Sequence, residues 1–221
     1  MKLSIWDMDM TIIRRASWLP WLLHFARTEA PARLLLAPLL LLLVVGYGLR
    51  MLDRAGLKQT MQRIMMGQRV PAHAVHRAAQ GFATGFGARN ELPGALQQLA
   101  VDRADGFLPV LATASPRFYA EVLANRWGIH DVVATESRWD GYALTPQIEG
   151  DNCYGIAKFA AVEAWLAARG LRREDCEIRF ASDHMSDLPL LLWADAPLVA
   201  NPSAALRREA LAQGWPVFDW A

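Results

Sequence analysis

The chain contains few cysteines, and it lacks a segment that resembles a secretory signal peptide. Cys153 and Cys176 are the only two cysteines among 221 residues, and their spacing matches neither a zinc motif nor a secreted disulfide framework. The acidic residue Asp7 follows Met1 too closely for an apolar leader segment to lie between them. These absences predict reduced thiols and a cytoplasmic protein.

The sequence also lacks an excess of charge of either sign. The formal net charge is +1, so no basic surplus indicates a nucleic-acid partner. Hydrophobic residues make up 53% of the chain and charged residues 20%, which is a richer apolar content than most water-soluble domains have. Part of this apolar content is concentrated in one segment, residues 34–49.

Residues 34–49 contain no charged side chain, and Arg33 and Arg50 flank them. At roughly 16 residues, the run is shorter than the ~20 that a spanning helix needs, and Pro38 interrupts it. Three interpretations follow from the sequence. The segment is a buried helix of a cap or dimer interface, an element that lies in a lipid surface, or a span in a thinned bilayer.

Aromatic residues just before this run favour the lipid-surface interpretation. Trp18, Trp21 and Phe25 recur at helical spacing, with Arg27 close by. Aromatic rings beside arginines are typical of a helix that lies at a membrane surface. Under this interpretation the protein makes peripheral contact with the inner face of the membrane.

The order of the predicted elements indicates an α/β fold. Residues 14–105 are predicted to be helical almost throughout, and an Asp140-Gly141 turn predicts a hairpin. Predicted strands are 3–6, 110–112, 132–134, 178–181, 198–200 and 217–218, and predicted helices are 116–127, 157–168, 188–193 and 204–212. Their alternation predicts a doubly wound, mostly parallel sheet built from residues 1–13 and 106–221. Residues 14–105 are then an inserted helical cap.

Polar residues follow several of the predicted strands. Asp7 and Asp9 come after the first strand, Thr113 ends the second, and Asp183 follows the strand at 178–181. Ligands bind beyond the carboxyl ends of such strands, so these side chains are expected to converge. Crowded carboxylates repel one another and stay ionised only beside a cation, and Mg²⁺ is the hard, oxygen-liganded ion that fits best.

The full pattern resembles the haloacid dehalogenase superfamily of phosphohydrolases. The segment Asp7-x-Asp9-x-Thr11, then Thr113, then Lys158, then Asp183-x-x-x-Asp187 follows the order of the four motifs of that superfamily. The stretch that begins at Thr113 and the hairpin before Lys158 are similar to the phosphoserine phosphatase branch. Met10 stands where that superfamily often has glycine or a polar residue, and Ser182 stands where it usually has glycine.

The resemblance implies a role for each motif residue. Asp7 would attack phosphorus and form an aspartyl-phosphate, while Asp9 would act as general acid and then as general base. Thr113 would hold the phosphoryl oxygens and Lys158 would balance their charge. The implied Mg²⁺ ligands are Asp7, the backbone carbonyl of Asp9, and Asp183, with Asp187 just behind them.

Other residues near these motifs are candidates for substrate binding. Thr11 belongs to the first motif, and Ser115 is an alternative to Thr113 as phosphate ligand unless it caps the following helix. Arg14 and Arg117 lie next to catalytic segments and are candidates for binding a second anionic group. His184 lies within the fourth motif, where we expect it to face solvent.

We therefore expect a Mg²⁺-dependent phosphomonoester hydrolase. Two substrate classes remain open: a small phosphoserine-like phosphomonoester, and a lipid-linked phosphate such as phosphatidylglycerophosphate, which would suit the apolar cap. A phosphotransferase of the same family is an alternative, and a catalytically silent, membrane-associated interaction protein is another. The intact motif residues argue against the silent protein.

Overall fold

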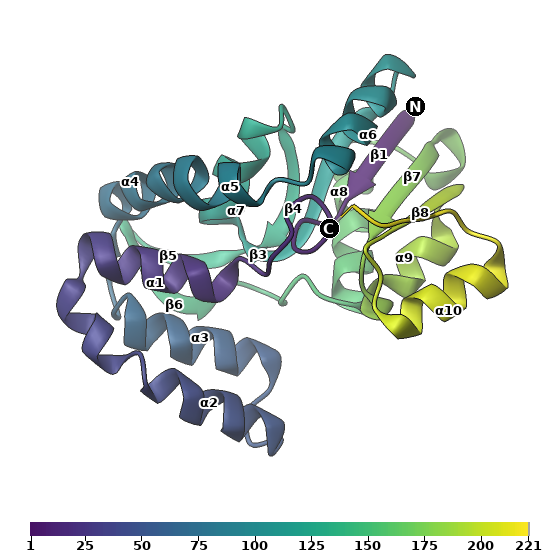
Figure 1. Cartoon of the computed structure of the whole chain (residues 1–221). Coiled ribbons are helices and arrows are strands. Elements are labelled where there is room, and N and C mark those ends of the chain that lie inside the picture. Colours follow the sequence, from purple (N-terminus) through teal and green to yellow (C-terminus); the bar gives the residue numbers. More distant parts are fainter. Residues whose placement is uncertain (221) are drawn as a thin grey trace.

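The computed structural model describes residues 1–220 and contains two sheets (Figure 1). The larger sheet has six parallel strands in the order β4-β3-β1-β7-β8-β9, which confirms the predicted doubly wound α/β fold. Its strands are β1 (Lys2–Trp6), β3 (Leu108–Pro116), β4 (Asp131–Thr135), β7 (Glu177–Ser182), β8 (Ala196–Ala200) and β9 (Val217–Phe218). The alternation of strands and helices after residue 106 places this sheet at the centre of the catalytic half.

Helices cover both faces of this sheet. One face packs on α8 (Ile156–Ala168), α9 (Leu188–Trp193) and α10 (Ala204–Gln213), and the other on α6 (Pro93–Ala104) and α7 (Arg117–Arg126). Both faces need to be covered because successive side chains of a strand point to opposite faces of the sheet. Ile5 belongs to the first of these apolar clusters and Trp6 to the second.

The inserted region is helical, and it forms the lower and left part of the view in Figure 1. Its elements are α1 (Trp18–Glu29), the 3₁₀ turn η1 (Pro31–Leu36), α2 (Leu39–Gly48), α3 (Arg54–Met65), β2 (Val70–Pro71), α4 (Ala72–Phe82), the π-helical turn η2 (Ala83–Gly87) and α5 (Ala88–Asn90). The segment from α1 to α3 is called the cap below. The division at residues 13 and 106 stays a prediction, and α6, which precedes residue 106, packs on β3 of the main sheet.

A small antiparallel sheet lies beside the cap. It contains β2, β5 (Ser137–Asp140) and β6 (Ala143–Ile148) in the order β2-β6-β5, and α3 packs against β6. The hairpin predicted at Asp140-Gly141 is confirmed. Gly141 has φ 58°, a left-handed conformation that glycine adopts without steric cost. The remaining short elements are the 3₁₀ turns η3 (Arg173–Asp175) and η4 (Met185–Asp187). Cys153 and Cys176 are free thiols, and both are buried.

The apolar segment 34–49 is exposed, so its interpretation as a buried cap helix is wrong. It folds as η1 and α2 with Pro38 between them, and Leu40 is its one buried side chain. Leu35 is 84% exposed and Leu41 is 71% exposed, although exposure of such side chains to water is unfavourable. Within residues 1–220, no helix is long and apolar enough to cross a bilayer.

Two of the aromatic residues expected at a membrane surface lie in the core instead. Trp21 is fully buried and stacks on Tyr119 with ring centroids 5.0 Å apart, and Phe82 meets its edge at 5.5 Å. Phe25 is also buried. The helical spacing of these residues marks the inner face of α1, because the helix packs against α4 of the inserted region.

We predict that Trp21→Ala lowers the free energy of unfolding by about 3–5 kcal/mol, because it empties a packed aromatic cluster. The measurement is urea unfolding followed by circular dichroism. Leu19→Ala is the matched control on the same helix, since Leu19 is 45% exposed, and it should change stability by less than about 0.5 kcal/mol. A similar small change for both variants would contradict the packing described here.

Candidate active site

The predicted strand-end residues meet in one cavity of about 210 Å³. Asp7 follows β1 directly, and its backbone N–H still donates to Ala181 of β7, so the strand pairing continues into the site. Asp183 follows β7 in the same way. The side chains that line this cavity are those of Asp7, Asp9, Met10, Ala16, Arg54, Thr113, Ala114, Tyr154, Lys158, Asp183, His184, Ser186 and Asp187.

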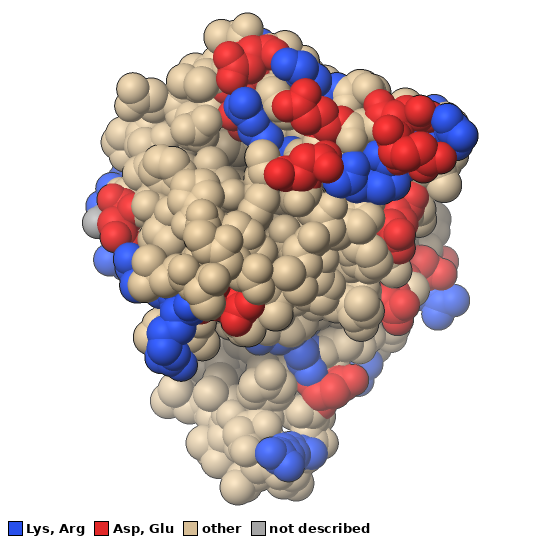
Figure 2. All heavy atoms as spheres, turned by 90° about the vertical axis from the view of Figure 1, so that its right-hand side faces the viewer, with Lys and Arg blue, Asp and Glu red and all other residues tan. Residues whose placement is uncertain are grey.

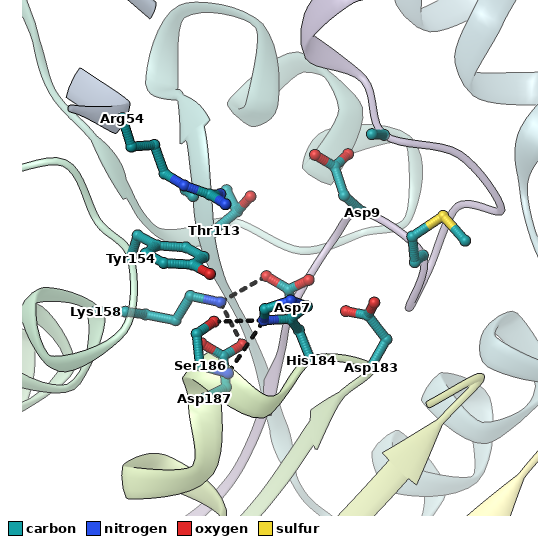
Figure 3. Close-up of a pocket in the computed structure, with 13 residues that line it drawn as sticks. Asp7, Asp9, Arg54, Thr113, Tyr154, Lys158, Asp183, His184, Ser186 and Asp187 are labelled. Carbon is teal, nitrogen blue, oxygen red and sulfur yellow. Dashed lines mark hydrogen bonds and ion pairs between the residues drawn. The ribbon is translucent and has the colours of Figure 1, made fainter. Parts of the chain in front are cut away.

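Lys158 lies between two carboxylates at the floor of the cavity. Its Nζ donates to Oδ1 of Asp7 at 2.7 Å and to Oδ2 of Asp187 at 2.6 Å (Figure 3). Lys158 occupies the first turn of α8, and Gly155, with φ 60°, makes the turn that begins this helix. The ammonium is buried, so its two charged partners replace the water that it loses.

The cavity carries more negative charge than Lys158 balances. Burial, together with the charges of Asp187 and Asp183, raises the pKa of Asp7 to about 8 although Lys158 opposes this change. Burial also raises the pKa of Asp183 to about 7. For Lys158, burial alone would lower the pKa of the ammonium, but Asp187 and Asp7 outweigh it and raise the value.

The donor set of the cavity fits a hard cation such as Mg²⁺. Asp7 and Asp183 are buried or partly buried carboxylates, and within residues 1–220 Oδ1 of buried Asp187 has no hydrogen-bond partner. No set of three His, Cys, Asp or Glu side chains in the described chain would hold a metal ion without other ligands. An ion held here would therefore use backbone or water oxygens as well, as magnesium sites commonly do.

Asp9 stands across the cavity from Lys158 (Figure 3). Its Oδ1 accepts the backbone N–H of Ser17 at 3.1 Å, and its Oδ2 accepts the hydroxyl of Ser115 at 3.4 Å. Burial raises the pKa of the Asp9 carboxyl. Thr113 is buried on the same cavity wall, and its Oγ1 accepts the N–H of Ser115, which leaves its hydroxyl hydrogen available to a ligand.

Met10 and Ser182, which depart from the motif pattern, have separate structural effects. Met10 has φ 62°, a left-handed conformation that costs a non-glycine residue about 1–2 kcal/mol, and Asn201 donates to its carbonyl oxygen at 2.9 Å. Ser182 is buried and donates to Oδ2 of Asp187 at 2.8 Å. Ser182 and Lys158 therefore both donate to Oδ2 of Asp187 and orient this carboxylate.

A second cavity of about 230 Å³ adjoins the first, because Asp9, Ala16, Arg54 and Ala114 line both. The apolar part of its wall consists mainly of Trp18, Tyr47 and Leu57, all from the cap. We call it the cap cavity. It brings the exposed helix α2, through Tyr47, next to the strand-end carboxylates.

Arg54 and Lys58 supply positive charge to the cap cavity, and the sequence analysis missed both. The guanidinium of Arg54 lies 3.8 Å from the ring centroid of Tyr154, and within residues 1–220 it has no carboxylate partner. Lys58 donates to the carbonyl of Ala114 at 2.6 Å and to Asn152 at 2.7 Å. Burial, aided by the charge of Arg54, lowers the pKa of Lys58 to about 8. Their spacing on α3 matches no motif, so only the fold reveals them.

The structure does not bring all predicted substrate-binding residues to the first cavity. Arg14 is exposed outside it, and Arg117 pairs with Glu136 at 2.6 Å. Thr11 is buried and its hydroxyl lies 3.5 Å from Asp183. Ser115 lines the cap cavity instead.

His184 lies at the rim of the first cavity. It is exposed there, as expected, and its Nδ1 accepts the N–H of Ser186 at 3.1 Å. The side chain therefore shapes the mouth of the cavity without contacting the carboxylates below.

Comparison with curated proteins yields relatives that are similar over about half of the chain. A histidinol-phosphatase of Neisseria meningitidis serogroup C is 29% identical over 119 residues, which are 50% of this chain and 51% of that protein. The chain spans between 38% and 51% of the length of the curated relatives that it matches.

Solved structures match over the whole chain. A protein of unknown function from Bordetella pertussis Tohama I has a TM-score of 0.88 and 27% identity, with 100% of this chain and 99% of that one covered. A phosphoserine phosphatase, solved as an analogue of its phospho-aspartyl intermediate, has a TM-score of 0.64 and 14% identity, with 100% and 93% covered. The second likeness shows a shared fold.

The haloacid dehalogenase-like hydrolase family matches residues 5–192, a range that includes all four predicted motifs. The parallel sheet, the carboxylates at its strand ends and this match agree. The chain belongs to the haloacid dehalogenase-like hydrolase family.

Proposed function

We propose that this chain is a Mg²⁺-dependent phosphomonoester hydrolase in which Asp7 is the nucleophile. The observation that carries the proposal is the buried contact of Lys158 with both Asp7 and Asp187, in a cavity that Asp9 and Thr113 also line. A nucleophile, an acid, a hydroxyl donor and a cation in one cavity are the groups that phosphoryl transfer requires. The name of the histidinol-phosphatase relative supports the same reaction class.

In the first step, a carboxylate oxygen of Asp7 attacks phosphorus and the bond to the leaving oxygen breaks. That oxygen departs with the bonding electrons and takes a proton from Asp9, whose raised pKa favours the protonated form that this step needs. Thr113 donates to a phosphoryl oxygen, and Lys158 balances the charge that the new aspartyl-phosphate brings into the cavity.

In the second step, water attacks the aspartyl-phosphate. Asp9, now a carboxylate, accepts a proton from this water, and the bond between phosphorus and the Asp7 oxygen breaks. Inorganic phosphate and free Asp7 result. Asp7, Asp183 and the backbone carbonyl of Asp9 would hold Mg²⁺, with Asp187 behind them. When bound, the ion supplies positive charge that keeps these carboxylates ionised and neutralises the phosphoryl oxygens.

The cap cavity favours an amphiphilic leaving group. Asp9 lines both cavities, so the oxygen that it protonates lies on the side of the cap cavity. The walls there combine the apolar surfaces of Trp18 and Leu57 with the charges of Arg54 and Lys58. Of the two substrate classes that the sequence leaves open, this lining favours a lipid-linked phosphomonoester with a second anionic group over phosphoserine.

We also propose that the cap contacts a membrane surface through η1 and α2. Residues 34–49 carry no charge, most of their side chains are exposed, and arginines flank the segment. Figure 2, which faces the right-hand side of the view in Figure 1, shows many charged side chains at its upper end and few at its lower end, the level at which the cap lies in Figure 1. Because Tyr47 of α2 also lines the cap cavity, a lipid that enters from this surface would reach the site directly.

We predict that Asp7→Asn abolishes phosphate release from para-nitrophenyl phosphate, a loss of at least about a thousandfold. The amide is a poor nucleophile, so no aspartyl-phosphate forms. Phosphate release is measured with Mg²⁺ present, and circular dichroism checks the fold. Asp151→Asn is the control, because Asp151 is exposed and lies outside both cavities. Undiminished release by the Asp7 variant would rule out the mechanism.

We predict that Mg²⁺ raises the thermal unfolding temperature of the wild type, because it relieves repulsion among the buried carboxylates. Asp183→Asn removes one of these charges and should lose the shift, whereas Asp151→Asn should keep it. Differential scanning calorimetry with Mg²⁺ and after chelation measures the effect. An equal shift in all three proteins would contradict a magnesium site at Asp183.

We predict that Arg54→Gln raises KM by about 10–100-fold for phosphomonoesters with a second anionic group, since it removes a charge-assisted hydrogen bond. Phenyl phosphate, which has no second anion, should be affected by less than about threefold. Arg63→Gln is the control, because Arg63 is exposed on the same helix. Steady-state kinetics with both substrates tests this, and equal losses on the two would contradict the assignment.

We predict that the wild type floats with anionic phospholipid vesicles in a density gradient. The double variant, which carries both Leu41→Glu and Val45→Glu, should not float. The new charges would have to enter the apolar layer. Leu211→Glu, which alters an exposed leucine on α10, is the control and should still float. A wild type that stays in the dense fraction would overturn the membrane assignment. A wild-type dimer that the double variant disrupts would overturn it as well.

A further inference from the structure

A chain of three buried hydroxyl groups ends at Asp9. The Oγ atoms of Ser17 and Ser115 lie 3.1 Å apart, and Oγ of Ser17 lies 3.0 Å from the hydroxyl of Tyr119. Ser115 donates in turn to Oδ2 of Asp9. Ser17 and Tyr119 have no exposed surface, and Ser115 has 3%, so water does not compete for these hydrogen bonds. We call Ser17, Ser115 and Tyr119 the hydroxyl chain.

The three hydroxyls form one hydrogen-bonded cluster beside Asp9. Ser115 donates to Oδ2 of Asp9, and the side chain of Ser17 is also a hydrogen-bond partner of the Asp9 carboxyl. Tyr119 is a hydrogen-bond partner of both serines. Each hydroxyl has a single hydrogen, and the Asp9 oxygens are acceptors that this buried cluster can reach. Tyr119 is thereby linked through the two serines to the carboxyl of Asp9.

Ser17 has no other evident structural role. It precedes the first residue of α1, a position where serine side chains usually accept a hydrogen bond from the helix backbone. Its side chain makes no such cap hydrogen bond here. Instead, its backbone N–H holds Oδ1 of Asp9 while its hydroxyl supports the residue that holds Oδ2. One residue at the start of the cap therefore acts on both oxygens of the carboxyl.

We propose that Ser17 and Tyr119 are positioning residues that, together with Ser115, orient the carboxyl of Asp9 for proton transfer to the leaving oxygen. The inference deepens the proposed function and rests on it. With both oxygens held, rotation of the carboxyl is restricted, and Asp9 stays where it lines both cavities. Ser17 and Tyr119 are fully buried and line neither cavity, so they act on the reaction only through Asp9 and Ser115.

The test uses esters that differ in their need for an acid. Para-nitrophenolate leaves readily without protonation, whereas the alkoxide of glycerol phosphate does not. Ser17→Ala and Tyr119→Phe should each lower kcat/KM for glycerol phosphate by at least about tenfold and for para-nitrophenyl phosphate by less than about twofold. The ratio kcat/KM is used because it reports the steps up to the first phosphoryl transfer.

Two controls separate positioning from general damage. Thr28→Val removes a hydroxyl of α1 that bonds only to the backbone of its own helix, so it should change neither rate. In an Asp9→Asn background, Ser17→Ala should cause no further loss, because the group that it orients is gone. Thermal unfolding verifies the fold, and Tyr119→Phe provides an independent variant if Ser17→Ala is unstable.

Two results would overturn the positioning role while the proposed function stands: equal losses on both esters, or a full additional loss in the Asp9→Asn background. A wild type that releases phosphate from neither ester would overturn the proposed function, and the role of the hydroxyl chain with it. Selective loss on glycerol phosphate that disappears in the Asp9→Asn background supports the inference.

Discussion

The buried ammonium of Lys158 is the interaction on which the site depends. It joins the nucleophile candidate Asp7, at the end of β1, to Asp187, beyond the end of β7. Without its charge, these carboxylates would be buried with nothing to oppose their repulsion, and the protonated forms would prevail. Even with it, burial and the neighbouring carboxylates keep the pKa of Asp7 raised, and the proposed Mg²⁺ would supply further positive charge.

The cap buries some of its apolar side chains and leaves others exposed. It buries aromatic side chains of α1 against the rest of the inserted region, yet leaves η1 and α2 exposed although they are its most apolar part. A protein in water would gain stability by covering such a surface. The proposed contact with lipid gives that surface a partner, and the cap cavity connects it to the carboxylates.

Several features could be predicted from the sequence, because they depend on local patterns. The parallel sheet follows from alternating strands and helices, and the convergence of Asp7, Thr113 and Asp183 follows from their places at strand ends. Residues such as Arg54 and Tyr119 could not be found in this way. Arg54 lies on α3 of the inserted region and Tyr119 on α7, and no rule of spacing states which face of a helix will turn toward a side chain that is distant in the sequence.

By itself, the sequence determined the fold class, the family motifs and the charge chemistry of the site, because strand periodicity and motif order are properties of neighbouring residues. Only the tertiary structure decided which apolar side chains are covered. Trp21 and Leu41 are both strongly apolar, yet one is in the core and the other is exposed. Burial depends on what packs against a side chain, and that partner is set by the path of the whole chain.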